Sequence, residues 1–310
     1  MEEKIEIMNL LQSKQVLEHE LQSLAYGSVE IRENESNKYI YVHYREDGVA
    51  LTKYVGEYSD ELYNLVLNNS IKAKQLKKQI REITKKLKQL NYTEEELSEK
   101  VEQNIDFAKR HLVDTIYKQA ILEGVATTFA DTESIIEGGK VNNMTSEDIL
   151  KIVNLKHAWE FILNKNVILS DTNFALLCEI NKMVEEGFYY TAGKVRNTPV
   201  TIGGTTWKPD LPIESVIKEE LEEIFNKELN DVDRAIELLL YTMKKQVFID
   251  GNKRTAVIYS NHYLISKGKG IIAIPAELTE EFKDLLIPYY EGRDEKEIKK
   301  FIKEKCYMSI

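Results

Sequence analysis

The sequence has few cysteines, few prolines and no long apolar run, and each shortage excludes a class of protein. Its two cysteines, Cys178 and Cys306, lie too far apart for a metal-binding or redox motif, and such sparse usage is typical of the reducing cytoplasm. No apolar stretch approaches the roughly 20 residues that span a bilayer, and the first residues are too acidic for a secretory signal. We therefore expect a cytoplasmic protein without a membrane partner.

None of the five prolines precedes Pro199, so the first two thirds of the chain can form long helices. The net charge of −10 argues against broad nucleic-acid binding. One local exception lies between Lys72 and Lys88, where eight basic residues accompany a single glutamate. A solvated helix face is the favoured interpretation of this run, and contact with an acidic partner or nucleic acid is the alternative.

The N-terminal part of the chain combines regularly spaced leucines with alternating strand formers. Two amphipathic helices are indicated by Leu10, Leu17, Leu21 and Leu24, and by Leu76, Ile80, Ile83, Leu87 and Leu90. Between them, residues 39–45 and 49–55 flank Asp47-Gly48, which predicts a hairpin. We predict that residues 1–95 form a helical hairpin carrying a small antiparallel sheet, and that residues 96–310 form a second domain that is mainly helical. The seam of the second helix could close within one chain or between two, so an oligomer is possible through these helices or through the second domain.

The most informative stretch is Gln246-Val-Phe-Ile-Asp-Gly-Asn-Lys-Arg-Thr255, which predicts a tight turn between two helices. Gly251 allows close approach of a ligand to the backbone. Hydrogen-bond donors gather at the start of the second helix: Asn252, Lys253 and Arg254. By itself such a turn is more often a plain helix cap, but it also suits a polyphosphate, with Asp250 placed to hold a divalent cation. The stretch contains no histidine, cysteine or serine that could act as base or nucleophile.

This stretch resembles the signature of the Fic family, His-x-Phe-x-(Asp/Glu)-Gly-Asn-x-Arg, at every listed position after the first. The likeness extends over roughly residues 100 to 300 and implies a mainly α-helical core. It also implies transfer of AMP from ATP to a Ser, Thr or Tyr hydroxyl of a target protein. In the family, the histidine is the general base, the phenylalanine anchors the loop and the acidic residue holds Mg²⁺, while Gly-Asn and the arginine bind phosphates. By position, these roles fall on Gln246, Phe248, Asp250, Gly251, Asn252 and Arg254, and Lys253 joins the nucleotide-binding set.

Two further segments resemble parts of the family outside the motif. Residues 192–206 have the sequence pattern of a hairpin, and they resemble the flap that aligns a target chain by strand addition. The flap itself would comprise Thr201, Ile202, Gly203 and Gly204. Residues 131–139 resemble an inhibitory helix, in which a glutamate reaches into the nucleotide site and displaces the γ-phosphate. That glutamate would be Glu137, with Ser134 in the same motif, although Glu133 stands where a Ser or Thr is usual.

Three departures limit what the resemblance implies. The carboxamide of Gln246 can orient a hydroxyl but cannot accept a proton at neutral pH, and general-base catalysis is typically worth about 10²–10⁴ in rate. Val257 replaces a second arginine that in many relatives pairs with the inhibitory glutamate, so Glu137 would need another partner, of which Arg254 is a candidate. Lys253 gives the Asn-Lys-Arg-Thr-Ala order of the Doc toxin, a Fic relative that transfers the γ-phosphate.

Three hypotheses of function follow. The first is an ATP-binding and Mg²⁺-binding Fic protein whose AMP transfer is weakened or lost through Gln246. His262 is a poor substitute base, since it lies about 15 Å along its helix from Asn252. The second is a non-catalytic interaction module, in which the N-terminal region binds a partner on a Fic scaffold. The third is a protein phosphotransferase of the Doc type. In the first and third hypotheses the acceptor is a target protein whose identity the sequence leaves open.

Overall fold

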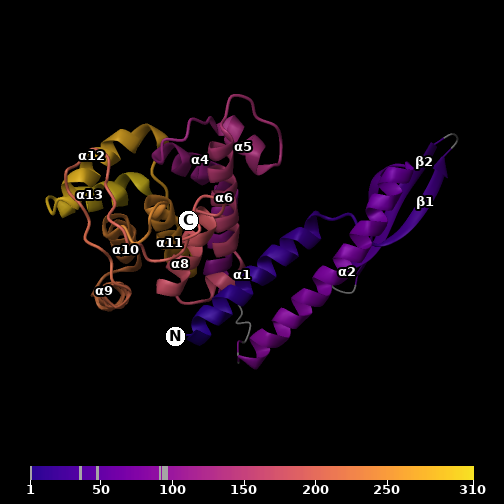
Figure 1. Ribbon diagram of the computed structural model, residues 1–310, viewed down its shortest axis with the longest axis horizontal. Coiled ribbons are helices and arrows are strands. Elements are labelled where there is room, and N and C mark those ends of the chain that lie inside the picture. Colours follow the sequence, from indigo (N-terminus) through magenta and orange to yellow (C-terminus); the bar gives the residue numbers. More distant parts are fainter. Residues whose placement is uncertain (1, 35–36, 47–48, 91, 93–96) are drawn as a thin grey trace. The chain divides into compact units, whose positions relative to one another are not determined.

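The computed structural model describes residues 2–34, 37–46, 49–90, 92 and 97–310 (Figure 1). The chain divides into two compact units, Met1–Thr93 and Glu94–Ile310. Helices dominate, and the prediction of a mainly α-helical fold with a small antiparallel sheet is confirmed. Among the described residues of both units, no helix is both long and apolar enough to cross a membrane.

The N-terminal unit is a pair of helices that carries a three-stranded sheet. Helix α1 (Glu2–Ser23) packs against α2 (Asp60–Gln89), so the apolar seam of α2 closes within one chain. The antiparallel strands follow the order β1 (Ser28–Asn34), β2 (Asn37–Glu46) and β3 (Val49–Glu57). The predicted pairing of β2 with β3 is present, whereas the turn assigned to Asp47-Gly48 lies outside the described residues.

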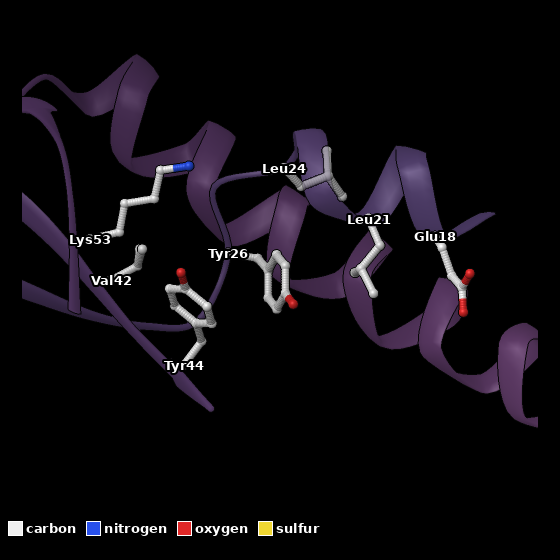
Figure 2. A pocket seen from close by; sticks show the side chains of 7 residues that line it. All are labelled: Glu18, Leu21, Leu24, Tyr26, Val42, Tyr44 and Lys53. Atoms are coloured by element: carbon white, nitrogen blue, oxygen red, sulfur yellow. The ribbon is translucent and has the colours of Figure 1, made fainter. Parts of the chain in front are cut away.

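The sheet of this unit has two different faces. Ile40 and Val42 of β2 are buried with Val66 of α2, and this cluster fixes the sheet to the helix. Because side chains alternate along a strand, Tyr39 and Tyr41 lie on the opposite face, where both contact Tyr54. A separate hollow of about 350 Å³ opens where the end of α1 meets the sheet (Figure 2). It is lined by Glu18, Leu21, Leu24, Tyr26, Val42, Tyr44 and Lys53.

The C-terminal unit is built around one buried helix. Its helices are α3 (Glu99–Arg110), α4 (Leu112–Leu122), α5 (Phe129–Ile136), α6 (Ser146–Ile162), α7 (Lys165–Ile168), α8 (Phe174–Val184), α9 (Glu214–Asn226), α10 (Asp231–Lys245), α11 (Asn252–Ser266), α12 (Thr279–Tyr290) and α13 (Glu295–Phe301). Short strands β4 (Ile271–Ile272) and β5 (Tyr307–Met308) pair near the C-terminus, with single turns at Ala276–Leu278 and Ile302–Cys306. Nearly every residue of α11 is buried, because α3, α6, α8 and α10 all pack against it.

The buried polar side chains of α11 are paired within the core. Asn261 donates to the carbonyls of Val257 and Ile272 and accepts the amide of Ile272, which satisfies the backbone of β4. The ring nitrogens of His262 lie 2.8 Å from the hydroxyl of Thr172 and 2.9 Å from the carbonyl of Val167. Complete burial lowers the pKa of His262 to about 4. This histidine is therefore a neutral core residue, and it contributes nothing to the cleft described below.

The segment 192–206 differs from its prediction. The sequence pattern predicts a hairpin, but every residue of this segment is described and none lies in a strand. Arg196 explains the difference: its guanidinium donates to the carbonyls of Thr198, Asp210 and Gln246 at 2.6–2.8 Å. Within the segment, the carbonyl of Thr198 is thus taken by a side chain, and Pro199 has no N–H to donate to a ladder. A two-stranded ribbon without a third strand would add little stability in return.

Candidate functional site

The predicted turn connects α10 to α11 and contains two left-handed residues. Gln246, at φ 49° and ψ 58°, ends α10, and Gly251, at φ 72°, precedes α11. A left-handed backbone is unusual for a residue other than glycine and requires local compensation. Gln246 has two such contacts: its side-chain amide donates to the carbonyl of Met243 at 2.6 Å, and its own carbonyl accepts from Nε of Arg196 at 2.6 Å.

Asn252 braces the inside of the loop. Its amide donates to the side-chain oxygen of Gln246 at 3.1 Å and to the carbonyl of Phe248 at 2.8 Å, and its oxygen accepts the N–H of Phe248. The ring of Phe248 is 1% exposed. From α8, Asn181 donates to the carbonyl of Asp250 at 3.0 Å. The loop is thus held at three points by neutral amides and a buried ring.

Gly251 is required by both conformation and space. A Cβ at this position would lie 3.0 Å from Cδ of Glu185 and closer still to its Oε1, and the positive φ would add strain. Next to it, the carboxylate of Asp250 is half exposed and accepts the N–H of Gly251 at 2.7 Å. The turn therefore presents one acidic group to solvent while its backbone packs tightly on a second, buried one.

Arg254 lies in a buried cluster of carboxylates. Its side chain is 2% exposed, and NH2 lies 2.7 Å from Oε1 of Glu185 at the end of α8. Nε lies 3.5 Å from Glu123, and Lys253 lies 3.4 Å from the same carboxylate. Burial raises the pKa of Glu185 to about 7, although Arg254 acts in the opposite direction. Within the part of the chain that is described, Nε and NH1 of Arg254 have no hydrogen-bond partner.

Helix α4 brings Glu123 to this cluster. Gln119 of α4 donates to the backbone carbonyl of Arg254 at 2.7 Å and accepts from the indole of Trp159 at 3.0 Å. Residues four apart lie on the same side of a helix, so Glu123, which caps α4, faces the side chain of Arg254. Sequence reasoning missed this residue. A Glu-Gly pair at a helix end marks both Glu123 and Glu137, and only tertiary packing separates the two.

A cleft of about 520 Å³ opens in front of the motif. Predicted residues on its wall are Thr201, Ile202, Gly203, Gly204, Gln246, Asp250, Asn252 and Lys253. Glu123 also lines it, as do residues of α12 that sequence reasoning did not identify: Glu280, Lys283, Asp284, Leu286, Ile287 and Tyr290. The structure therefore brings the loop at 201–204 and the motif to one cavity. Phe248, Gly251 and Arg254 lie behind this wall.

Glu137 lies elsewhere. It caps α5, and its side chain is exposed, as is that of Glu133, while Ser134 is partly buried. Among the described residues, the carboxylates that pair with Arg254 are those of Glu123, Glu185 and Asp250. The position that the resemblance gives to Glu137 beside Arg254 is thus filled by Glu123.

Asp250 is the one motif carboxylate that faces the cleft. In the described ranges, no three His, Cys, Asp or Glu side chains gather into a metal site. A cation at Asp250 would need further ligands from a bound phosphate, which is how Mg²⁺ is commonly held. The half-exposed carboxylate of Asp250 fits a metal-bound polyphosphate, as do the two donors of Arg254 that have no hydrogen-bond partner among the described residues.

Comparison with known proteins agrees with this geometry. The sequence model described as "Fic/DOC family" matches residues 171–264, and no curated protein matches the chain. Similar solved structures include a Fic-domain-containing signaling protein from Bacteroides thetaiotaomicron, at 19% identity and TM-score 0.51, covering 61% of this chain and 75% of that one. Fic-1 (residues 134–508) from C. elegans has 16% identity and TM-score 0.52, with 78% and 79% coverage. A Fic family protein from Desulfovibrio desulfuricans has 13% identity and TM-score 0.52, with 67% and 72% coverage. The chain carries a domain of the Fic/DOC family, and its helical core has the Fic fold.

Proposed function

We propose that the cleft binds ATP with Mg²⁺ and that the chain is a protein adenylyltransferase of the Fic type whose transfer step is weakened by Gln246. The observation that carries this proposal is the state of the Gln246 side chain. It lines the cleft with Asp250 and Asn252, yet its amide donates a hydrogen bond to the carbonyl of Met243 and its oxygen accepts one from the amide of Asn252. This supports the proposal, because the groups that would bind phosphate lie at the cleft while the position of the base holds a neutral group that is already hydrogen-bonded.

The groups around the cleft divide into phosphate-binding and metal-holding roles. Asp250 would hold Mg²⁺, which neutralises phosphate charge when bound. Lys253 and the backbone N–H of Asn252, two residues of the cleft wall, would contact the phosphates directly. Arg254 would meet the distal phosphates with Nε and NH1, the two nitrogens that lack a hydrogen-bond partner in the described chain. Any residual catalysis would come from this electrostatic stabilisation, with Gln246 only orienting the acceptor.

The target protein would enter along the loop at Thr201–Gly204. This loop lines the cleft, Gly204 packs close to Ile287 of α12, and none of the loop residues is in a strand. A backbone that is in no strand suits strand addition by an extended segment of a target. A Ser, Thr or Tyr hydroxyl on that segment would then lie over Gln246.

We place the inhibitory role at Glu123 rather than at Glu137. Glu123 pairs with both Lys253 and Arg254, the two cations of the motif, and it lines the cleft. A distal phosphate must displace this carboxylate to reach either cation. Val257 is buried and cannot supply a second guanidinium, so the competition concerns Arg254 and Lys253 alone.

The proposal is tested by calorimetry followed by label transfer. Wild type should bind Mg-ATP, with weaker binding in the presence of a chelator and after Arg254→Ala. With Gln246→His, label from [α-³²P]ATP should appear on the chain or on added target protein. Label that appears from the γ-position instead would show phosphotransfer of the Doc type. Absence of ATP binding to the folded wild type would contradict the proposal.

A second candidate function, a protein-interaction module, is favoured by the outer face of the N-terminal sheet. There Tyr39 and Tyr41 each contact Tyr54, and Arg32 lies over the ring of Tyr41. Tyrosine and arginine are enriched where proteins bind one another. If Mg-ATP does not bind and Tyr41→Ala abolishes binding of a protein partner to the full chain, this second function is the correct one.

A further inference from the structure

Glu185 is a buried acid that the cleft does not expose. It caps α8, is 2% exposed and lies directly beneath Gly251. Its Oε1 lies 2.7 Å from NH2 of Arg254, and it is not among the residues that line the cleft. Burying a carboxylate is costly unless its partner is well placed, so this contact calls for an explanation beyond packing.

Arg254 lies between two carboxylates, one buried and one that lines the cleft. Glu185 pairs with NH2 from beneath, whereas Glu123 lies 3.5 Å from Nε and lines the cleft. When an incoming phosphate displaces Glu123, the pair with Glu185 still fixes the guanidinium. Nε and NH1, which have no hydrogen-bond partner in the described part of the protein, are then the donors left for the ligand.

We propose that Glu185 is a positioning residue for Arg254: it anchors NH2 beneath the Gly251 turn, so that Nε and NH1 point at the distal phosphates and the site prefers ATP to AMP. The inference rests on the ATP binding proposed above and assigns the source of its preference for a triphosphate. Because Val257 replaces a second arginine, that preference depends on the pose of one guanidinium.

Loss of Glu185 has two opposed effects. Removing a negative charge would favour an anionic ligand. However, the carboxylates remaining near Arg254 would be Asp250 at 3.8 Å and Glu123 at 3.5 Å. Released from Glu185, Arg254 would pair more closely with Glu123, the direct competitor of the phosphate. Since hydrogen bonds to a charged partner are the strong ones, the second effect dominates.

The test compares Glu185→Gln with Glu186→Gln, which removes the same charge from the exposed neighbouring residue. Calorimetry with Mg-ATP and with AMP should give at least a tenfold rise in Kd for ATP in Glu185→Gln, with the Kd for AMP within twofold of wild type. Glu186→Gln should leave both constants unchanged. In a Glu123→Gln background, the effect of Glu185→Gln should shrink, because the competitor is gone.

Thermal unfolding of each variant shows that it is folded before binding is compared. If Glu185→Gln does not fold, Glu185→Asp can be used instead, since it withdraws the charge by one methylene. It should weaken the binding of ATP but not that of AMP. Equal losses for ATP and AMP, or no change in either, would overturn the positioning role while leaving ATP binding intact. Failure of wild type to bind ATP would instead overturn the proposed function, and the positioning role with it.

Discussion

The side-chain amide of Asn252 donates to the side-chain oxygen of Gln246 across 3.1 Å, which joins the first position of the motif to the start of α11. Through its own amide, Gln246 also caps the carbonyl of Met243. Both polar ends of the side chain are therefore used, one by α10 and one by the start of α11. The residue at the position of the family's base thus braces the turn between these two helices.

Replacement of Gln246 by histidine should restore transfer. An imidazole can accept a proton near neutral pH, and general-base catalysis contributes typically about 10²–10⁴ in rate. We expect incorporation of label from [α-³²P]ATP to rise by about a hundredfold or more. Gln246→Asn, which shortens the side chain without adding a base, is the control and should give no rise. An unchanged rate in Gln246→His with intact ATP binding would contradict the proposed mechanism.

Removal of the Glu123 carboxylate should strengthen ATP binding. Glu123→Gln frees Lys253 and Arg254 from their cleft-side partner. We expect the affinity for Mg-ATP to rise about tenfold, which corresponds to about 1.4 kcal/mol of binding free energy. The matched control is Glu137→Gln, since Glu137 is exposed and lies outside the cluster. If calorimetry shows that Glu137→Gln and not Glu123→Gln raises the affinity, the inhibitory role belongs to Glu137.

Gly251→Ala should destabilise the protein more than Gly138→Ala. Both glycines have a positive φ, 72° and 78°, so the conformational cost of about 1–2 kcal/mol is common to the two substitutions. Only at Gly251 would the new Cβ collide with another residue, Glu185, while nothing lies within 4 Å at Gly138. Each further kcal/mol should lower Tm by about 2–4 °C in a domain of this size. Equal shifts in thermal unfolding would show that Glu185 can move aside.

Acid should weaken the fold through His262. Its pKa is about 4 in the folded protein, lowered from 6.5 by burial, so between these values the unfolded chain binds a proton that the folded chain does not. The free energy of unfolding therefore rises with pH from about 4 to 6.5, and this contribution is lost as pH falls through that window. The full effect is about 3 kcal/mol. His262→Gln should flatten the dependence of Tm on pH between about 4.5 and 7, a range that begins inside this window and ends just above it. A slope equal to that of wild type would refute this origin.

Local patterns predicted the parts of the molecule that depend on local chemistry. The turn between α10 and α11 follows from the glycine and the donors around Asn252, and the leucine spacing indicated both N-terminal helices. Strand β1 went unpredicted, because charged residues interrupt its few apolar positions. Glu123 meets Arg254 through packing between elements more than a hundred residues apart, and such a contact leaves no recognisable pattern in the sequence. The prediction of a hairpin at 192–206 was wrong, because the side chain of Arg196 takes the carbonyl of Thr198 and ties the segment to Asp210 and Gln246 outside it.

Arg196 has a consequence for the order of events in the proposed reaction. Its guanidinium binds the carbonyl of Thr198, at the root of the loop that would receive a target, and the carbonyl of Gln246, at the corner of the motif. Movement of that loop would be transmitted to the motif through a single rigid, planar group. In the proposed reaction, recognition of a target and alignment of its hydroxyl would then be one concerted adjustment, and a poorly fitting target would misalign the motif corner as it docks.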